Sequence, residues 1–276
     1  MIRDGLALVA AVVVALTVSA CGGGIGDPAD ETPETPETPA AGQSPAPATD
    51  GDLAGELTVF AAASLHVVFE DIAELFTAEH PAAEVAFSFA GSSDLVAQLD
   101  AGAPADVLAT ADESTMATAV DSGVIDGAPQ VFAENALALI TPAGNPAGIT
   151  GLDESLDGAD LVVCAPQLPC GAAAETLAEQ VGTTLRPVSE EGSVTDVLGK
   201  VTSGQADAGL VYTTDAASAG AAVDIITVDG AEDVVNRYPV AVTTHANDPD
   251  LARAWAEFLL GPEAQDVLEA AGFAVP

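Results

Sequence analysis

Apolar residues follow two alternating spacings from about Leu53 to the end of the chain. Short and nearly continuous apolar runs, such as residues 57–63, are typical of buried strands. Between these runs, apolar residues recur every three or four positions, as they do from Leu65 to Phe76, and this spacing predicts helices with one buried face. Because strands and helices alternate, the pattern predicts an α/β domain.

The individual elements follow from the same spacing and from residues that end helices. His80 and Pro81 end the first helix, because a residue before proline avoids the helical conformation, and Gly102 ends the second. We predict strands or short extended segments at residues 57–63, 84–90, 105–112, 135–142, 160–166, 185–189, 207–213, 223–228 and 239–245. We predict helices from Ser64, at 92–101 and 113–121, from Gly171, from Ser193, and at 249–260 and 262–270.

Residues 1–20 have the pattern of a signal peptide. Arg3 gives a positive start, and the apolar run at residues 6–18 is too short to span a bilayer comfortably. The sequence V-S-A-C that ends at Cys21 resembles the lipobox of bacterial lipoproteins, in which the cysteine becomes the first mature residue and carries the lipid. The alternative is an uncleaved helical anchor with a free Cys21 thiol. In both cases we expect the rest of the chain to be extracytoplasmic, tethered to the outer face of the membrane.

The segment between Cys21 and the folded domain is predicted to be a disordered, acidic spacer. Residues 21–52 contain almost no apolar side chain to bury, and the triplet Glu-Thr-Pro recurs within them. Because prolines fix the backbone and like charges repel, this segment should stay extended without tertiary structure. The folded domain therefore begins near Leu53.

Composition narrows the choice of partners. The chain of 276 residues has 5 Lys and Arg against 43 Asp and Glu, which gives a formal net charge of −38. Nucleic acids and anionic membrane surfaces are bound through clustered basic residues, so we exclude nucleic-acid partners. The acidity itself has two open explanations: adaptation to a salty habitat, or simply an acid-rich solvated surface.

Two further cysteines, Cys164 and Cys170, lie in the stretch VVCAPQLPCG. An oxidising compartment outside the cytoplasm would favour a disulfide between them. Neither a C-x-x-C redox motif nor a metal-binding spacing competes for these residues. The open alternative is a pair of buried thiols.

No catalytic motif accounts for the domain. The sequence contains no G-x-S-x-G, no H-E-x-x-H and no complete Walker loop. His66, His80 and His245 are scattered, without acids or cysteines at the spacing of metal ligands. Ser64 and His66 could form a nucleophile and a base, but side chains two residues apart at a helix start point in different directions. A serine hydrolase that uses Ser64 stays as an alternative, while we expect no enzyme activity and no cofactor.

Small residues recur where strands or loops give way to helices. At three of these junctions a serine occupies the position expected for a helix cap. A helix N-terminus has unpaired N–H groups and a positive dipole end, and small side chains let an anion approach them. If two lobes bring the junctions together across a cleft, the chain would bind an anion through uncharged donors. The junctions are Ala63-Ser64, Gly91-Ser92, Cys170-Gly171 and Gly192-Ser193.

Five stretches of the chain occur in the order LTVFAAASL, FAGSSDL, AGAPADVLATAD, LPCG and GLVYTTDA. Together they resemble the molybdate-binding proteins of bacterial ABC importers, the ModA family. The resemblance covers about Leu57 to Phe273, and FAAASL, AGAPAD and the late V-Y-x-x-D-A are its most specific parts. It implies a two-lobed periplasmic-binding-protein fold of type II, in which a tetrahedral oxyanion, molybdate or tungstate, is held in the cleft between the lobes.

The resemblance also implies a set of ligand contacts. Ser64 and Ser92 would each offer the oxyanion a hydroxyl and a backbone N–H. Cys170 stands where the family has alanine, so only its N–H carries over, and Val194 would also donate through its N–H. The match around EEGSVTDV is open to a shift by one residue, which would make Ser193 the donor.

The last implied contact is Tyr212, whose phenol would donate one more hydrogen bond; the alternative is an amphipathic residue at a strand end. A site made only of donors suits molybdate, tungstate and sulfate, which are fully deprotonated near neutrality. Hydrogen phosphate carries a proton that needs an acceptor, so we expect it to bind poorly. A binding protein for another oxyanion such as sulfate therefore stays as an alternative, because only size would exclude sulfate.

The topology of the family implies how the lobes are divided. The first lobe would comprise residues 53–133 plus 238–276, and the second would comprise residues 134–237. Contacts from both lobes would favour a closed form, which the permease of the importer would recognise. We expect a monomer that delivers its ligand to this permease.

Overall fold

The computed structural model describes residues 53–276. The predicted signal peptide at residues 1–20 and the predicted lipidated cysteine and spacer at residues 21–52 lie outside the described residues. Within residues 53–276, no helix combines the length and the apolar character that a membrane crossing requires.

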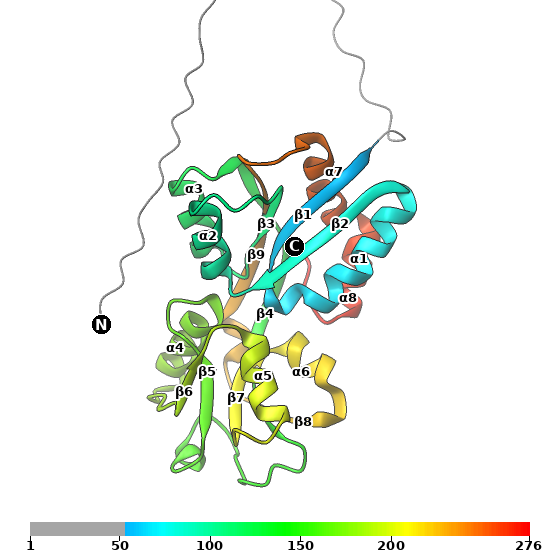
Figure 1. Cartoon of the computed structure of the whole chain (residues 1–276). Helices are drawn as coiled ribbons and strands as arrows, with labels where there is room; N and C mark the ends of the chain where they lie inside the picture. The colour runs from blue at the N-terminus through cyan, green and yellow to red at the C-terminus, as the bar shows by residue number, and fades with distance from the viewer. Residues whose placement is uncertain (1–52) are drawn as a thin grey trace, which may run out of the picture. The chain divides into compact units, whose positions relative to one another are not determined.

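Strands and helices alternate over most of this part of the chain, as the apolar spacing predicts (Figure 1). The strands are β1 (Ala54–Ala62), β2 (Ala82–Ala90), β3 (Val107–Ala109), β4 (Ile125–Pro142), β5 (Leu161–Cys164), β6 (Ser189–Glu191), β7 (Ala208–Tyr212), β8 (Val223–Ile226) and β9 (Val235–Thr243). The helices are α1 (His66–Glu79), α2 (Ser92–Asp100), α3 (Glu113–Asp121), α4 (Pro169–Val181), α5 (Val194–Thr202), α6 (Thr213–Ala219), α7 (Pro249–Leu259) and α8 (Pro262–Ala270).

The strands are hydrogen-bonded in the order β2-β1-β3-β9-β4-β7-β5-β6, and β8 also pairs with β4. On one side of this order β1 lies parallel between β2 and β3, and on the other side β5 lies parallel between β6 and β7. We call β1–β3 with α1–α3, α7 and α8 the first half, and β5–β8 with α4–α6 the second half. The two halves are separate in Figure 1, where β4 and β9 run between them.

The long antiparallel strands β4 and β9 are the two routes by which the chain passes between the halves. β4 pairs with β9 in its first part and with β7 and β8 in its second part. The lobe boundaries expected from the resemblance fall in the ladder of β4 and β9, where Ala133 pairs with Tyr238 and Glu134 pairs with Arg237. The two expected crossovers therefore lie opposite each other.

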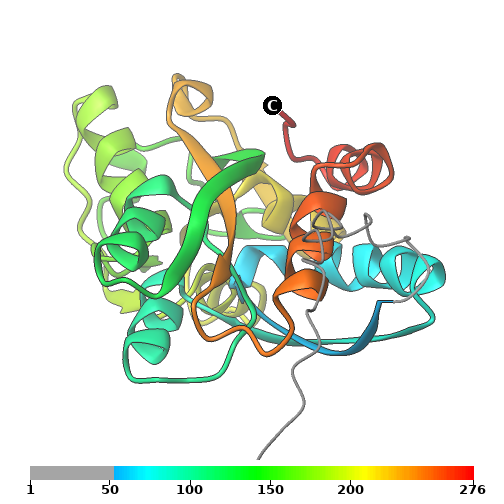
Figure 2. The ribbon, with the colours of Figure 1, turned by 90° about the horizontal axis from the view of Figure 1, so that it is seen from above.

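Helices cover both faces of the first half. Figures 1 and 2 show α1, α7 and α8 together on one face, and α2 and α3 on the other. Trp255 of α7 is fully buried and lies edge-on to Phe69 and Phe76 of α1, with ring centroids 5.7 Å and 5.3 Å away. The predicted apolar face of α1 is buried except at Leu75, which is 38% exposed. These contacts hold β1 and the turn after it against a rigid layer.

Some elements differ from the prediction. β4 begins at Ile125 rather than at the predicted Asn135. The glycine and proline between these residues look like a turn in the sequence, but the strand continues through them with shifts in its register against β9. Helix α6 was not predicted, since its seven residues contain too few apolar side chains to show a helical spacing. The predicted extended segment at 185–189 is wrong except for Ser189, where β6 begins.

Candidate functional site

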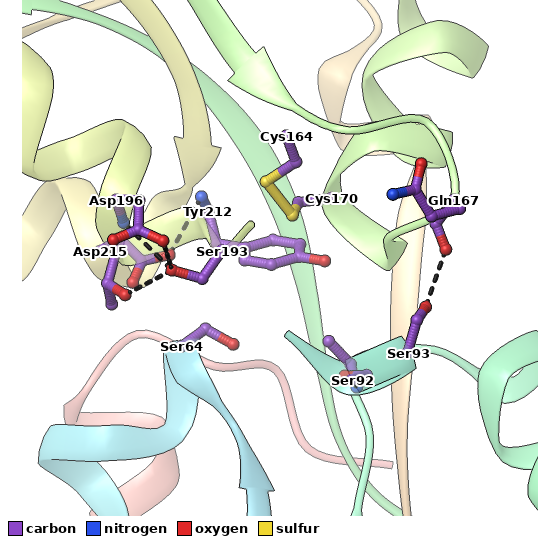
Figure 3. Close-up of a disulfide and its surroundings, with 12 residues drawn as sticks. Ser64, Ser92, Ser93, Cys164, Gln167, Cys170, Ser193, Asp196, Tyr212 and Asp215 are labelled. Atoms are coloured by element: carbon purple, nitrogen blue, oxygen red, sulfur yellow. Dashed lines mark hydrogen bonds between the residues drawn. A yellow bond between two sulfur atoms is a disulfide. The ribbon is translucent and has the colours of Figure 1, made fainter. Parts of the chain in front are cut away.

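A small cavity lies where the first half meets the second, and all five residues that the resemblance selects as ligand contacts line it. The cavity has a volume of about 20 Å³, which is space for one small group. In Figure 3, Ser64 and Ser92 lie on the side of the first half, and Cys170 and Tyr212 lie on the side of the second. The lining residues are Ala62, Ala63, Ser64, Ala90, Gly91, Ser92, Ala111, Leu168, Pro169, Cys170, Ser193, Val194 and Tyr212.

Ser64 lies in a 3₁₀ turn, Ala63–Leu65, between β1 and α1. The prediction that the helix begins at Ser64 and that Ser64 caps it is wrong, because α1 begins at His66 after this turn. The Ser64 Oγ instead lies 3.0 Å from the Oη of Tyr238 on β9. The buried methyl groups of residues 61–63 leave the cavity open beside this hydroxyl.

Ser92 is the first residue of α2, and Gly91 occupies the cap position, so the predicted cap role of Ser92 is also wrong. Its buried Oγ accepts a hydrogen bond of 3.0 Å from the N–H of Ala111. The hydroxyl hydrogen of Ser92 is therefore not needed for this bond. The N–H groups of the first helical turn have no acceptor within the helix, so the N–H of Ser92 is a second donor beside the cavity.

Helix α4 begins at Pro169, two residues before the predicted start at Gly171. Proline fits the first helical turn, where its missing N–H costs no hydrogen bond of the helix. Cys170 follows in the same turn and forms a disulfide with Cys164, with an S–S distance of 2.05 Å. A Cβ at Gly171 would lie 2.0 Å from the carbonyl oxygen of Ala165. The disulfide and this close approach together hold the N–H of Cys170 at the cavity.

Ser193 is the cap of α5, as predicted for this junction. Its Oγ accepts from the N–H of Asp196 at 3.2 Å and donates to the Asp196 Oδ2 at 2.7 Å. Val194 is the buried first residue of α5, so its N–H has no acceptor within the helix. The Ser193 hydroxyl is already hydrogen-bonded to Asp196 of α5. The geometry therefore favours the N–H of Val194, rather than the Ser193 hydroxyl, as the donor to the cavity at this junction.

Tyr212 ends β7 and lies in the cavity (Figure 3). Only 1% of the residue is exposed, and its Oη has no hydrogen-bond partner among residues 53–276. Burial, reinforced by the neighbouring Tyr238, raises the pKa of Tyr212 well above its ordinary value, so the phenol keeps its hydrogen. A buried donor without an acceptor costs free energy, which an acceptor placed in the cavity would recover.

Asp215 fixes the backbone at Tyr212. Its Oδ2 accepts a hydrogen bond of 3.2 Å from the N–H of Tyr212, across the first turn of α6. Burial raises the pKa of Asp215 to about 7, although this hydrogen bond acts in the opposite direction. Near neutrality Asp215 therefore places less negative charge beside the cavity than an ordinary aspartate would.

Sequence analysis missed Tyr238, which is fully buried behind Ser64. Its ring meets those of Phe132, Tyr212 and Phe273 edge-on, with centroids 6.4 Å, 5.8 Å and 5.6 Å away. The only signal in the sequence is a tyrosine directly before the apolar strand predicted at 239–245. No spacing relates it to Ser64, which is 174 positions earlier.

The donors of the cavity are uncharged. No Lys or Arg is among the described residues that line it. Within the described range, no group of three or more His, Cys, Asp or Glu residues could hold a metal ion. The site thus has the chemistry of an anion site rather than of a cation site. Lys200, Arg237 and Arg253 pair with acids elsewhere, in the pairs Lys200–Glu191, Arg237–Glu113, Arg237–Glu134, Arg253–Asp126 and Arg253–Asp250.

Ser64 and His66 do not act on each other in this structure. The His66 Nε2 lies 3.4 Å from the Oε1 of Glu70, and its ring meets Phe89 edge-on at 4.9 Å. The Ser64 hydroxyl pairs with a tyrosine instead. This arrangement gives Ser64 no general base and lends no support to the serine hydrolase alternative.

The two halves touch beside the cavity. The Oγ of Ser93 donates to the carbonyl oxygen of Gln167 across the gap at 2.8 Å (Figure 3). A Cβ at Gly91 would lie only 2.5 Å from the carbonyl oxygen of Gly192, so glycine is needed at this approach. These contacts join the two halves beside the cavity.

The sequence profile of the bacterial extracellular solute-binding proteins matches residues 57–274, nearly the whole of the described part. The chain belongs to this family. Several relatives of the solute-binding protein bear the name molybdate-binding protein ModA. The one from Mycobacterium tuberculosis is 44% identical over 234 residues, which cover 84% of this chain and 89% of the relative. The one from Escherichia coli is 33% identical over 232 residues, with 80% and 90% covered.

Solved structures show the fold of this solute-binding protein. The periplasmic molybdate-binding protein of Azotobacter vinelandii superposes with a TM-score of 0.70 at 23% identity and covers 80% of this chain and 99% of its own. The sulfate-binding protein SubI of M. tuberculosis gives a TM-score of 0.68 at 19% identity, with 80% and 86% covered. The predicted periplasmic-binding-protein fold and the predicted ModA resemblance are both confirmed.

Proposed function

We propose that this solute-binding protein captures molybdate or tungstate in the cavity between its halves and delivers it to an ABC importer. The observation that carries the proposal is the buried phenol of Tyr212, which has no partner among the described residues and lies in a cavity lined by uncharged donors. The donors from the other junctions are those of Ser64, Ser92, Cys170 and Val194. The name of the 44% identical mycobacterial relative supports the same ligand.

A tetrahedral dianion suits such a set of donors. N–H groups at helix starts carry partial positive charge, and hydroxyl groups donate without a permanent charge. Hydrogen bonds to a charged group contribute roughly 1.5–3 kcal/mol each, so a handful supports micromolar or tighter binding after the cost of closing the halves. Molybdate and tungstate carry no proton near neutrality and can accept from every donor.

The two halves would serve as lobes that close over the ligand. The first lobe would comprise residues 53–133 plus 238–276, the second residues 134–237, and β4 with β9 would form the hinge. A ligand that binds donors of both lobes stabilises the closed form over the open form. The closed shape is then the form that the permease recognises. The hydrogen bond between Ser93 and Gln167 supports this assignment, because it joins the two halves directly.

A lipid on Cys21 would hold the protein at the outer face of the membrane, with the acidic segment before Leu53 as the spacer. The V-S-A-C sequence that ends at Cys21 supports this part of the proposal. The protein would act as a monomer, with the oxyanion as its ligand and without a further cofactor. The mass of the N-terminal peptide from membrane-bound protein would test the lipid.

Sulfate is the second candidate ligand. It is also a tetrahedral dianion without a proton, so a cavity of donors would accept it, and a sulfate-binding protein shares the fold. Discrimination against sulfate would depend on the size of the closed cavity rather than on hydrogen bonding.

The proposal is tested by elemental analysis of the purified protein and by isothermal titration with molybdate, sulfate and hydrogen phosphate. Molybdenum or tungsten at about one atom per chain, or molybdate binding at micromolar or lower Kd, would support it. Hydrogen phosphate is the control ligand, because its proton has no acceptor among the proposed donors. Tight phosphate binding, or no binding of molybdate, would contradict the proposal.

A further inference from the structure

Ser64 and Ser92, the two serines of the cavity that lie in the first half, each have a hydrogen-bond partner on their hydroxyl oxygen. The Ser92 Oγ accepts from the N–H of Ala111 at 3.0 Å, and the Ser64 Oγ lies 3.0 Å from the Oη of Tyr238. A backbone N–H can only donate, so the hydrogen of Ser92 is left for an acceptor in the cavity. At Ser64 the outcome depends on which of the two hydroxyl groups donates.

Burial decides the direction of the bond at Ser64. Tyr238 is fully buried, and its burial raises its pKa well above the ordinary value, so the phenol keeps a hydrogen that needs an acceptor. The nearby Oδ1 of Asn135 already accepts from the Oγ1 of Thr213 at 2.7 Å and from the N–H of Ala136 at 3.0 Å. Ser64 lines the cavity and has another direction for its own hydrogen. Ser64 is the hydrogen-bond partner that the described residues give to the Tyr238 Oη, so the cost of an unpaired buried hydrogen favours the phenol as the donor and Ser64 as the acceptor.

We propose that Tyr238 is a specificity-determining positioning residue, which turns the hydroxyl hydrogen of Ser64 into the cavity by donating to its oxygen. The inference rests on the proposed function, since it concerns the same oxyanion site. Tyr238 donates to the hydroxyl oxygen of Ser64, just as the backbone N–H of Ala111 donates to that of Ser92. With Tyr212 also donating, the hydroxyl groups of Ser64, Ser92 and Tyr212 present only hydrogens to the cavity, while the hydroxyl of Ser193 is engaged by its own helix. The preferred ligands are then tetrahedral dianions without a proton, because hydrogen phosphate would set its own hydrogen against a donor.

The variant Tyr238→Phe tests this role, since it keeps the aromatic ring and removes only the donor. The Ser64 hydroxyl could then rotate and accept as well as donate. We expect the Kd of molybdate to rise about fivefold to tenfold and that of hydrogen phosphate to stay or fall, so that their ratio changes about tenfold. The measurement is isothermal titration of the full chain at about pH 8, where inorganic phosphate is largely a dianion that still carries a proton.

The same substitution in a Ser64→Ala background is the matched control. There Tyr238→Phe should leave the ratio of the two Kd values unchanged, because its effect passes through the Ser64 hydroxyl. Equal weakening of both ligands, or a change in ratio that persists without the serine, would show that Tyr238 acts only through packing. If the wild type binds molybdate and the ratio does not move, the inference alone fails. If the wild type binds no molybdate, the proposed function fails and the inference falls with it.

A neutron structure of the wild-type protein gives a check that needs no ligand. We expect a hydrogen on the Oη of Tyr238 that points to the Ser64 Oγ. A hydrogen on Ser64 that points to Tyr238 would overturn the inference even if the binding ratios agreed with it.

Discussion

At the scale of single residues, the donor groups of the cavity are held in place by hydrogen bonds to residues behind them. Tyr238 and Ala111 hold the hydroxyl oxygens of Ser64 and Ser92, respectively. Asp215 holds the backbone N–H of Tyr212. The Tyr212 phenol has no hydrogen-bond partner among the described residues. The groups that line the cavity are therefore preorganised, and under the proposed function a change in one of them should affect binding more than folding.

Replacing Tyr212 by phenylalanine should separate binding from stability. The variant loses a donor to a charged ligand, so the Kd of molybdate should rise roughly tenfold to a hundredfold. The free energy of unfolding of the ligand-free protein should stay the same or increase by about 1 kcal/mol, because an unpaired buried hydroxyl is removed. Titration calorimetry and urea unfolding check the two effects, and a large loss of stability would refute the assignment of an unpaired phenol.

Asp215 should make stability depend on pH. Its pKa is about 7 in the folded protein, above the ordinary value of 3.8, so the folded state holds this proton more tightly than the unfolded state. The contribution to stability is then fully present below about pH 4 and is lost as the pH rises to about 7, with a total on the order of 4 kcal/mol.

Urea unfolding of wild type and Asp215→Asn at several pH values measures this effect as a difference. The asparagine keeps an oxygen for the N–H of Tyr212 but does not titrate. The wild type should lose stability relative to the variant between about pH 4 and pH 7. A difference that is independent of pH would show that the carboxyl titrates normally.

Sequence reasoning reached the residues that point into the cavity better than the residues that support them. Ser64, Ser92 and Tyr212 lie in short motifs with a family resemblance, and the structure brings them together. Tyr238 could not be predicted as a partner of Ser64, because a contact between positions so far apart depends on how β9 returns to the sheet. The disulfide partners Cys164 and Cys170 were accessible from compartment and spacing alone, and they are joined in the structure.

At the scale of elements, the helix starts decide where donors lie. α4 is held at its start by the disulfide, by Pro169 and by the close approach of Gly171 to Ala165. The helices with strong apolar spacing, such as α1, α7 and α8, could be predicted nearly to their ends. The first residues of α7 and α8 also agree with the prediction. The first residues of α1 and α4 could not be predicted, because a 3₁₀ turn or a leading proline shifts the start without changing the apolar spacing.

Gly171→Ala should disturb this element, while Gly199→Ala serves as its control. A Cβ at Gly171 meets the carbonyl oxygen of Ala165 at 2.0 Å, whereas a Cβ at Gly199 in α5 meets nothing within 4 Å. We expect Gly171→Ala to lower the free energy of unfolding by about 1–3 kcal/mol and to weaken molybdate binding. Gly199→Ala should raise stability by roughly 0.5–1 kcal/mol, because alanine is the better residue in a helix interior.

Urea unfolding and molybdate titration of both variants check this pair. A Gly171→Ala protein as stable as the Gly199→Ala protein would mean that α4 can move away from β5 without cost. In that case the start of α4 would not be fixed by packing.

At the scale of the whole molecule, a large excess of acidic residues surrounds a site without formal charge on its donors. The formal net charge is −38, and the described ion pairs of Lys and Arg lie outside the cavity. Repulsion among the acidic side chains destabilises the compact state. At physiological salt this repulsion is largely screened between charges more than about 8 Å apart. Salt should therefore change stability more than it changes the local affinity of the cavity for its ligand.

The melting temperature should rise between low and molar sodium chloride if the acidity is an adaptation to salt. Chloride is the appropriate salt, because sulfate could occupy the cavity and stabilise the protein by binding. Differential scanning calorimetry of ligand-free protein makes the measurement. A melting temperature that does not increase would leave the acid-rich surface as a feature of composition only.

The position of β9 between β3 and β4 has a consequence for biosynthesis. The second half is one continuous stretch, whereas the first half needs β9, α7 and α8, which are made and exported after the second half. The second half can thus fold before β9, the strand that pairs with β3 of the first half, has been made. A nascent chain interrupted before Val235 would contain every proposed ligand contact and would still lack the strand that brings them to one place.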